Sequence, residues 1–321
     1  MFKITLIKSN HYSHVSQDAI IDLENEIIHS FNCKIKYELP SIFLKYLGKV
    51  YYHFPKLFNL LSVIRVNENF FVVLMGGGEY AKFPLFAFSG KHKILYLFDS
   101  WQPRFSQIKN MIENLKIDIV FFSYKQSFEY FKKSLPKVKC FWVPEGISFN
   151  EYYAVPYSKK DIDILHLGRR YDFYHNKIVD FCCENNLKYL YERKRGEIIF
   201  PSKTDFINGL ARSKISICVP SSITHPLRSG YISGLTQRYL QSMASKCLIL
   251  GYVPEDMKYL FDYNPIIQID MKNTTQQIND ILKNFSEYIK LIEKNYLEVK
   301  EKHQWKNRVT VIQSILEKNL R

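Results

Sequence analysis

The sequence predicts an α/β protein with two Rossmann-like, doubly wound lobes, each built on a parallel sheet. Short apolar runs, which are typical of buried strands, alternate along the chain with longer segments of helical periodicity. The length of 321 residues is twice that of a typical domain of about 150 residues. A polar stretch without periodicity, residues 150–160, separates two such sets. We therefore expect a first lobe over residues 1–150, a second over 151–302, and a terminal helix within 303–321 that packs back toward the first lobe.

Apolar runs predict the strands of the first lobe. They cover residues 3–7, 34–38, 70–75, 94–98, 119–123 and 140–143. The segments between these runs are long enough for crossover helices. Apolar residues at helical spacing mark three of these helices, over residues 16–30, 103–115 and 125–134.

The second lobe repeats this alternation. Strands are expected over residues 163–167, 188–191, 215–219, 247–250 and 266–269, and helices over 174–185, 204–213 and 236–245. A single long helix from 274 to about 302 and a terminal helix over 305–316 are expected to brace the lobes. In doubly wound folds the ligand lies at the carboxyl ends of the strands, which predicts a site in a cleft between the facing lobes.

Composition limits the class of protein. The hydrophobic fraction of 46% and the charged fraction of 24% are ordinary for a globular protein and exclude disorder for most of the chain. The net charge of +14 indicates an anionic partner, although the same lysine-rich bias follows from AT-rich coding. The six cysteines form no C-x-x-C pair and have no zinc spacing, and neither a signal peptide nor a membrane span is expected. We therefore expect a cytoplasmic protein with reduced cysteines and no metal site.

Two loops of the first lobe carry candidate ligand-binding residues. Gly77 and Gly78 follow a strong strand, so this loop either approaches a ligand closely or forms only a tight turn. Asp99 follows strand 94–98 and is a candidate general base, a hydrogen-bond acceptor for a sugar, or, with Ser100, the cap of the next helix. Trp101 could stack on a sugar or base, or fill the lobe interface.

The second lobe opens with an apolar strand that runs directly into Gly168, Arg169 and Arg170. Glycine permits close approach of a ligand, and arginine pairs bidentately with phosphate oxygens, although both arginines could equally be solvated. His166 alternates with leucines in the strand. This pattern favours a core histidine over a catalytic one.

The richest polar region runs from Val219 to Gly251. Its loop contains Ser221 and Arg228, and Thr236 then begins a helix that carries Arg238 in its first turn. A polar loop that enters a helix N-terminus favours an anion, whereas a cation in that turn opposes the helix dipole. Arg238 therefore indicates an anionic partner, either a ligand phosphate or a carboxylate elsewhere in the protein.

The pattern T-x-R-[YF]-x-[EQ]-x-x-A, followed by two aliphatic residues, resembles the donor-site segment of GT-B glycosyltransferases of the group 1 type, which include bacterial surface-polysaccharide enzymes. Its matches here are Thr236, Arg238, Tyr239, Gln241, Ala244, Leu248 and Ile249. Residues 142–147 resemble the segment that closes the first lobe of this fold. Residues 162–170 resemble the opening strand of the second lobe, and 211–220 the unit before the donor loop. The resemblance covers about half of the chain.

This resemblance implies a transferase that needs no metal and no cofactor and uses a nucleotide-sugar as co-substrate. The acceptor would be a glycan or a lipid-linked glycan in surface polysaccharide or lipopolysaccharide synthesis. The implied donor site includes Gly168, Ser221 and Thr236. The resemblance implies that Arg169 and Arg238 hold the diphosphate. Arg170 and Arg228 are weaker candidates for the same contact, and Gln241 touches the ribose or the sugar.

The expected catalytic base, if the enzyme inverts, is Asp99, with Glu145 as the second choice; Gly77, Gly78 and Trp101 are expected on the acceptor side. The chain departs from the family pattern at two positions. Gln241 stands where many relatives have glutamate, and Lys246 where they have a small residue. The stereochemical outcome therefore stays open.

One segment bears on location. Residues 42–65 combine Lys45, Lys49, Lys56 and Arg65 with many aromatic and aliphatic residues and contain no acidic residue. Such a segment suits the anionic inner face of a membrane, and it equally suits a helix pair whose apolar face is core.

A rival interpretation is a non-catalytic basic module that binds nucleic acid or an acidic polymer. The net charge and the many aromatic residues favour it. The lysines are spread along the chain, however, and no nucleic-acid-binding motif is present. We therefore expect no nucleic-acid partner.

Overall fold

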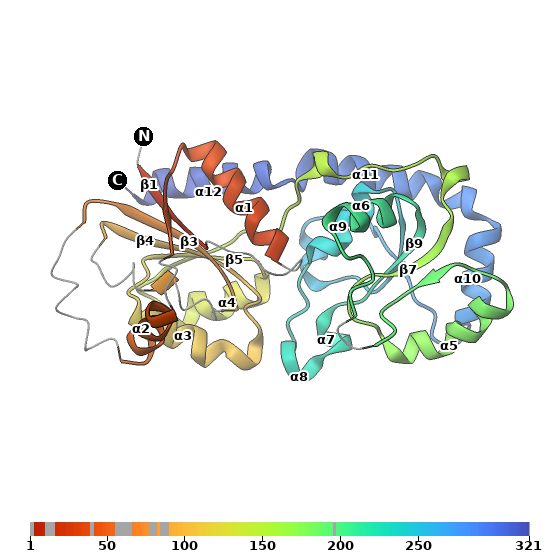
Figure 1. Cartoon of the computed structure of the whole chain (residues 1–321), viewed down its shortest axis with the longest axis horizontal. Helices are drawn as coiled ribbons and strands as arrows, with labels where there is room; N and C mark the ends of the chain where they lie inside the picture. The colour runs from red at the N-terminus through yellow and green to blue at the C-terminus, as the bar shows by residue number, and fades with distance from the viewer. Residues whose placement is uncertain are drawn as a thin grey trace. The chain divides into compact units, whose positions relative to one another are not determined.

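The computed structural model describes residues 3–9, 17–38, 42–54, 66–76, 82–83, 90–194 and 197–320. The chain divides into two compact units (Figure 1). The first comprises residues 1–145, 227–232 and 305–321, and the second comprises residues 146–226 and 233–304. Each unit holds one parallel sheet between helices, which confirms the predicted α/β class.

The first unit contains a six-stranded sheet in the order β2-β1-β3-β4-β5-β6. All of its neighbouring strands pair in parallel. The strands are β1 (Ile4–Lys8), β2 (Lys34–Tyr37), β3 (Asn69–Met75), β4 (His92–Phe98), β5 (Ile119–Phe122) and β6 (Lys139–Trp142). Each lies within two residues of its predicted bounds. The strands β1, β3, β4 and β5 are buried almost throughout and therefore read as near-continuous apolar runs, whereas the edge strand β2 is partly exposed.

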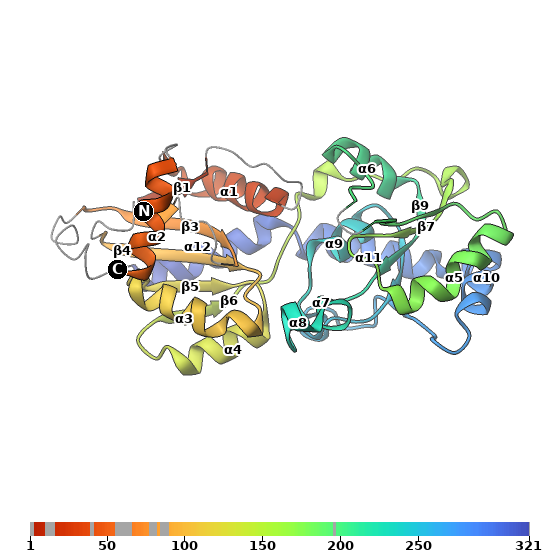
Figure 2. The same ribbon diagram turned by 60° about the horizontal axis from the view of Figure 1, so that its bottom comes forward.

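Helices cover both faces of this sheet (Figures 1 and 2). On one face, α1 (Asp18–Phe31) packs beside α12 (Trp305–Asn319), and their buried apolar residues join those of the sheet in one core. On the other face, α3 (Phe105–Asn114), α4 (Lys125–Ser134) and Tyr51 of α2 (Ile42–His53) contribute to a second core.

The terminal helix α12 belongs to the first unit. The buried ring of Trp305 packs edge-on against Tyr96 and Phe98 of β4, with centroid distances of 6.1 and 6.0 Å. Val309, Ile312 and Leu316 continue the same apolar stripe and are fully buried. The helical spacing of these residues is the reason that the helix packs on the sheet.

The second unit contains a five-stranded sheet in the order β11-β10-β9-β7-β8, again with parallel pairing throughout. The strands are β7 (Ile162–His166), β8 (Tyr189–Leu190), β9 (Ser213–Cys218), β10 (Leu248–Gly251) and β11 (Ile267–Gln268). Its helices are α5 (Asp172–Glu184), α6 (Lys203–Ala211), α7 (Ser221–Thr224), α9 (Gln237–Ala244), α10 (Thr274–Lys283) and α11 (Ile289–Lys302). A further short helix, α8 (Pro226–Ser229), begins at the last residue of the second unit before the chain enters the first.

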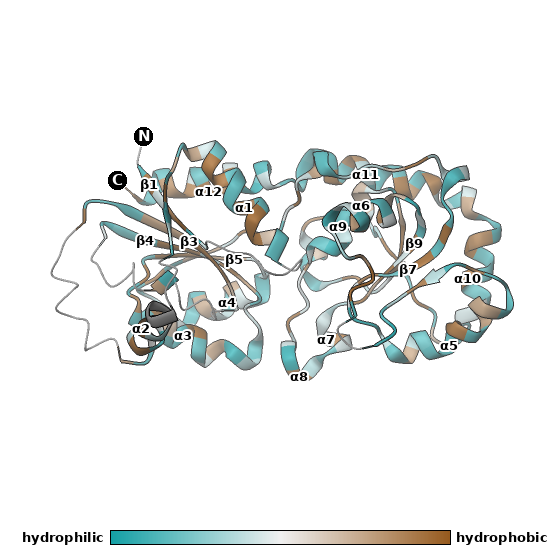
Figure 3. Cartoon of the chain, in the orientation of Figure 1, coloured by the Kyte–Doolittle hydropathy of each residue, from teal (hydrophilic) through white to brown (hydrophobic). Residues whose placement is uncertain are grey.

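Hydropathy follows the layers of both units. The strands are largely hydrophobic, whereas the helices carry both hydrophilic and hydrophobic residues (Figure 3). In the second unit α6 and α9 contribute to one core, whereas α5 and α10 contribute to the other. Because β7, β9 and β10 pair in parallel, their carboxyl ends lie at one edge of the sheet.

The single helix expected over residues 274–302 is wrong. Helix α10 ends at Lys283, a 3-10 turn covers Phe285–Tyr288, and α11 begins at Ile289. Asn284 has φ −109° and ψ 32°, outside helical geometry. Because of the break, Ile292 of α11 packs with α10 in one core, whereas Val299 reaches the other. The helix predicted over residues 103–115 likewise begins as a 3-10 turn, Gln102–Arg104, before α3.

The stretch expected to be a linker is packed into the second unit. Tyr152 is buried in its core, and Lys160 is only 3% exposed. The ammonium group of Lys160 donates to the carbonyl oxygens of Ala211, Ser213 and Ser245 at 2.9, 2.8 and 3.0 Å. Those carbonyls lie at the ends of α6 and α9 and at the start of β9, where a buried carbonyl oxygen needs a hydrogen-bond donor. The boundary between units falls at Glu145/Gly146 instead.

Residues 227–232, expected in the second lobe, belong to the first unit. Ile232 is fully buried in the core that α3 and α4 share. The ring of Tyr231 packs edge-on against Phe105, and its carbonyl accepts a hydrogen bond from Gln126 Nε2 at 3.3 Å. No periodicity in the sequence predicts that this segment belongs to the first unit. Its membership depends on contacts with residues that are distant in the sequence.

Candidate functional site

The turn after β7 brings together the two halves of the predicted donor motif. Gly168 has φ +78°, a conformation that glycine adopts without strain. The guanidinium group of Arg238, from the first turn of α9, lies directly against it. Its Nη1 donates to the carbonyl oxygen of Leu167 at 3.3 Å, and a Cβ on Gly168 would lie 3.0 Å from the guanidinium carbon. Gly168 and Arg238 therefore depend on each other for their positions.

The two arginines of this turn differ in their partners. Arg170 donates to the carboxylate of Asp172 at 2.6 Å and to the carbonyl of Glu192 at 3.0 Å, and it lies over the ring of Tyr191. Its donors are thus largely used within the protein, which argues against the expected phosphate contact. Arg169 makes no hydrogen bond or ion pair with any described residue and is half-buried. Arg169, rather than Arg170, has donors available for an anion.

A buried hydrogen-bonded network connects the end of β7 to the residues that follow this turn. His166 Nε2 accepts from the backbone N–H of Tyr171 at 3.2 Å, so Nδ1 carries the proton and donates to Tyr189 Oη at 3.2 Å. Tyr189 Oη also shares a hydrogen bond of 3.1 Å with His175 Nδ1. Burial, with the neighbouring His175, Arg238 and Arg170, lowers the pKa of His166 to about 3. His166 is therefore a neutral core histidine that positions the turn, as its place in the strand predicts.

Helix α9 presents polar groups at its N-terminus. Thr236 occupies the N-cap position without capping, and its buried hydroxyl has no hydrogen-bond partner in the described part of the chain. Gln237 Nε2 donates to the carbonyl of Gly146 at 2.8 Å. Gln241 Nε2 donates to Tyr152 Oη at 2.9 Å, which leaves its amide oxygen for a ligand. Ser221, also predicted for this site, begins α7 in the loop that follows β9.

In the first unit, Asp99 directly follows β4 with a left-handed φ of +50°. Its carboxylate accepts from Tyr124 Oη at 3.3 Å and forms an ion pair with Arg228 Nη2 at 3.3 Å. Burial raises the pKa of Asp99, against the opposing effects of Arg228 and Tyr124. The helix-cap alternative is wrong, because neither the 3-10 turn nor α3 has a side-chain cap.

The expected diphosphate contact of Arg228 does not fit this arrangement. Its guanidinium group lies in the first unit and is paired with Asp99. Its charge therefore acts on a candidate acceptor-side carboxylate and not within the predicted donor motif. The sequence carried no signal for this pair, because its members are 129 positions apart.

The remaining acceptor-side candidates are Gly77, Gly78 and Trp101. Gly77 and Gly78 lie outside the described residues, although Gly76 has φ +64° and accepts from Arg104 Nη1 at 3.1 Å. The stacking role of Trp101 is wrong: its ring is 4% exposed and packs at 4.8 Å on Tyr124, so no open face remains for a sugar.

Glu145, the second candidate base, is 5% exposed. It closes the first unit just before the chain enters the second, and its carbonyl accepts from Arg308 Nε at 3.2 Å. The buried carboxylate is therefore less accessible to an acceptor hydroxyl than that of Asp99, whose side chain is 22% exposed.

No cluster of metal-ligating side chains is found among the residues that the structure describes. In the same part of the chain, no helix is long and apolar enough to cross a membrane. All six cysteines are free thiols.

No protein-family model and no curated protein matches the sequence. Solved structures match the fold. Anabaena HepE in complex with UDP and glucose is 10% identical, with a TM-score of 0.62 over 98% of this chain and 100% of that chain. Sucrose-phosphate synthase from Thermosynechococcus elongatus is 10% identical, with a TM-score of 0.61 over 99% of both chains. A glycosyltransferase from Rickettsia africae is 10% identical, with a TM-score of 0.53 over 99% of both chains.

The chain therefore has the fold of GT-B glycosyltransferases, which confirms the fold that the motifs imply. At this level of identity the likeness concerns the fold alone. The arrangement of charged and polar groups in each unit must carry any argument about chemistry.

The network under the turn predicts a pH dependence of stability. The pKa of a histidine is about 6.5 when unfolded, and burial lowers that of His166 to about 3 in the fold. Between these values the unfolded chain binds a proton that the native protein does not, so stability is fully present above pH 6.5 and falls toward pH 3. His166→Gln retains an acceptor for the Tyr171 N–H but does not titrate. The free energy of unfolding of this variant should change less steeply with pH than that of the parent, and the two slopes should differ by up to about 1.4 kcal/mol per pH unit.

Denaturant unfolding between pH 4.5 and 7 measures this slope. His29→Gln, at an exposed position of α1, is the matched control and should retain the parental slope. An identical slope for His166→Gln and the parent would show that His166 is not held neutral.

Proposed function

We propose that the protein is a glycosyltransferase that moves a sugar from a nucleotide-sugar donor to a glycan or lipid-linked acceptor. The carrying observation is the guanidinium group of Arg238, held against Gly168 at the carboxyl end of β7. The fold supports the proposal, since HepE, which shares it, is described in complex with UDP and glucose.

The second unit would bind the donor. Arg238 lies in the first turn of α9, where a cation opposes the helix dipole. Its one hydrogen bond with a described residue is a long one, 3.3 Å, to the carbonyl oxygen of Leu167. A diphosphate at this point would be stabilised by Arg238, by the free donors of Arg169 and by the N-terminus of α9. The unpartnered hydroxyl of Thr236 could donate to the same ligand, and the amide oxygen of Gln241 could accept from a ribose hydroxyl.

The first unit would bind the acceptor, with Asp99 as the general base. Its buried surroundings raise its pKa and so make the carboxylate a better proton acceptor than an ordinary aspartate. The left-handed backbone at Asp99 is a strained conformation of the kind found at functional sites. The proton of the acceptor hydroxyl would pass to Asp99 as the new glycosidic bond forms.

The leaving diphosphate would need no metal ion, because arginine charges and a helix N-terminus neutralise it. We place the reaction in the cytoplasm, in the synthesis of surface polysaccharide or lipopolysaccharide. A lipid-linked acceptor would bring the enzyme to the inner face of the membrane. In support, Tyr46, Val50 and Phe54 form an exposed stripe at the i, i+4 and i+8 positions of α2 and the residue after it.

Arg238→Ala should weaken binding of nucleotide diphosphates about ten- to a hundredfold. The substitution removes a charge-assisted contact of about 1.5–3 kcal/mol, and the fold should stay intact. A thermal-shift panel of UDP, GDP and CMP identifies the nucleotide, and calorimetry then gives the affinity. Arg212→Ala, which removes an exposed arginine paired with Asp161, is the control and should bind like the parent.

Two outcomes would contradict this assignment. If Arg238→Ala binds the nucleotide with parental affinity, Arg238 is not part of the donor site. Stabilisation of the parent by polyanions such as heparin, but by no nucleotide, would favour the rival interpretation of a non-catalytic basic module.

Asp99→Asn should lower turnover by about 10²–10⁴-fold, because an amide retains the shape but cannot accept the proton. Nucleotide affinity should stay near the parental value, since the donor is assigned to the other unit. Tyr124→Phe, which removes the hydrogen bond to Asp99 but leaves the base, is the matched variant and should retain most activity. Near-parental turnover in Asp99→Asn would move the assignment to Glu145.

Membrane binding should be peripheral and salt-sensitive. Vesicles of anionic phospholipid should bind the protein at low salt and release it at high salt, because surface charge is screened within about 8–10 Å at moderate ionic strength. Replacing Tyr46 and Phe54 together by serine should weaken the binding, whereas replacing the exposed Phe173 of the second unit should not. Equal binding to neutral and anionic vesicles would contradict an electrostatic attachment.

A further inference from the structure

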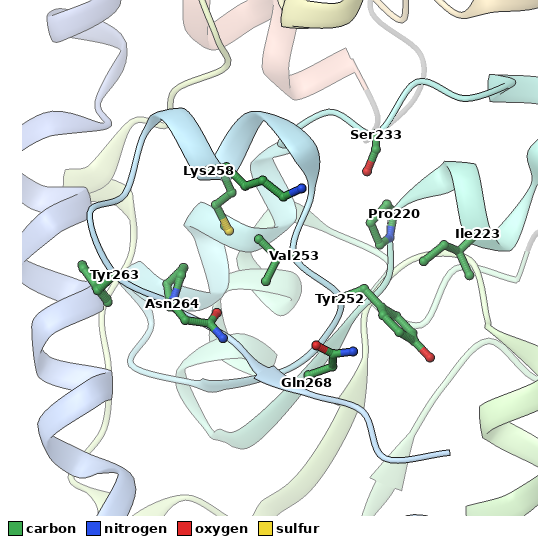
Figure 4. Close-up of a pocket in the computed structure, with 11 residues that line it drawn as sticks. Pro220, Ile223, Ser233, Tyr252, Val253, Lys258, Tyr263, Asn264 and Gln268 are labelled. Atoms are coloured by element: carbon green, nitrogen blue, oxygen red, sulfur yellow. The ribbon is translucent and has the colours of Figure 1, made fainter. Parts of the chain in front are cut away.

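A pocket of about 520 Å³ lies at the carboxyl edge of the second sheet, outside the predicted donor motif (Figure 4). Its walls come from the loops that follow β9 and β10 and from the segment that leads into and through β11. Small-molecule sites in proteins have volumes of about 300–1,000 Å³. The pocket is therefore large enough for a mono- or disaccharide.

Two amide groups lie on one side of this pocket, and Val253 and Lys258 lie on the other (Figure 4). The side-chain amide of Gln268 makes no hydrogen bond with any described residue. Asn264 Oδ1 accepts from the N–H of Ile266 at 3.2 Å, which leaves its amino group available. These amides therefore offer both donors and an acceptor to a ligand.

The pocket is close to electrically neutral. Among the described residues that line it, Lys258 is the one charged residue, and it is paired with Glu255 at 2.6 Å. Pro220, Val253 and Met257 supply apolar surface. A phosphate would find no free cation here, whereas a sugar offers hydroxyl groups to the amides and C–H faces to the apolar wall. The chemistry of the wall therefore suits a neutral carbohydrate.

Tyr252 connects this pocket to the candidate donor site. Its ring packs edge-on against Tyr171 at 6.3 Å, and the backbone N–H of Tyr171 is held by His166 beneath the Gly168 turn. Its carbonyl accepts from Tyr239, the residue after Arg238 on α9, at 3.2 Å. The pocket thus adjoins both elements that would hold the diphosphate.

We propose that this pocket is a subsite for a neutral sugar ring, recognised by the amide groups of Asn264 and Gln268. The assignment rests on the proposed function for the direction of transfer, since the sugar is either that of the donor or one of the acceptor glycan. Its chemistry, a neutral polyhydroxylated ring, is the same in both cases.

Gln268→Ala is the test variant, because this exposed side chain makes no contact that the fold requires. Gln276→Ala is the matched control, because Gln276 is an exposed glutamine of α10 whose side chain donates to Asp280 at 2.7 Å and does not line the pocket. Calorimetry compares UDP with UDP-glucose and UDP-galactose. Saturation-transfer NMR measures binding of free glucose, galactose, N-acetylglucosamine and maltose.

If the pocket holds the donor sugar, Gln268→Ala should weaken binding of a UDP-sugar about five- to tenfold and leave UDP unchanged. If it holds an acceptor sugar, the NMR signal of a free sugar should fall while UDP-sugar affinity is retained. Gln276→Ala should change neither. The proposal is overturned if no sugar, free or UDP-linked, binds in a way that Gln268→Ala weakens. A parent that binds no nucleotide would refute the proposed function, and the NMR measurement would still decide the pocket.

Discussion

The close approach of Arg238 to Gly168 is the constraint on which the candidate donor site depends. A Cβ at position 168 would lie only 3.0 Å from the guanidinium carbon, so a larger residue there would require the arginine side chain to shift. The turn also needs a positive φ, which glycine provides at little cost. Both features keep the Arg238 side chain directly against the turn at the end of β7.

Satisfied buried polar groups keep these elements in place. His166 remains neutral, accepts from Tyr171 and donates to Tyr189, so the turn rests on uncharged hydrogen bonds. Lys160 does the opposite: it carries its ammonium group into the interior and occupies it fully with three carbonyl oxygens. Leaving either set unpaired would cost far more than the hydrogen bonds contribute when made.

The two units share the chemistry unequally. The second carries the cations and helix terminus suited to a diphosphate, and a neutral pocket lined by amides beside them. The first carries a carboxylate whose pKa is raised by burial. One short segment connects the two functions along the chain, because residues 227–232 leave the second unit between β9 and α9 and supply Arg228 to Asp99. The sequence predicted Arg228 for the donor site, but its charge acts against the burial that raises the pKa of Asp99, the candidate base.

The sequence by itself determined the strands of both sheets, the start of α9 and the Gly-Arg turn, because each depends on local apolar spacing or backbone preference. It also indicated His166 as a core residue. Tertiary structure decided the rest. The break before α11, the burial of Trp101, the pairing of Arg170 and Arg228, and the position of residues 227–232 all follow from packing with distant partners. Local sequence patterns do not predict such partners, because the spatial neighbours of a side chain depend on how the whole chain folds.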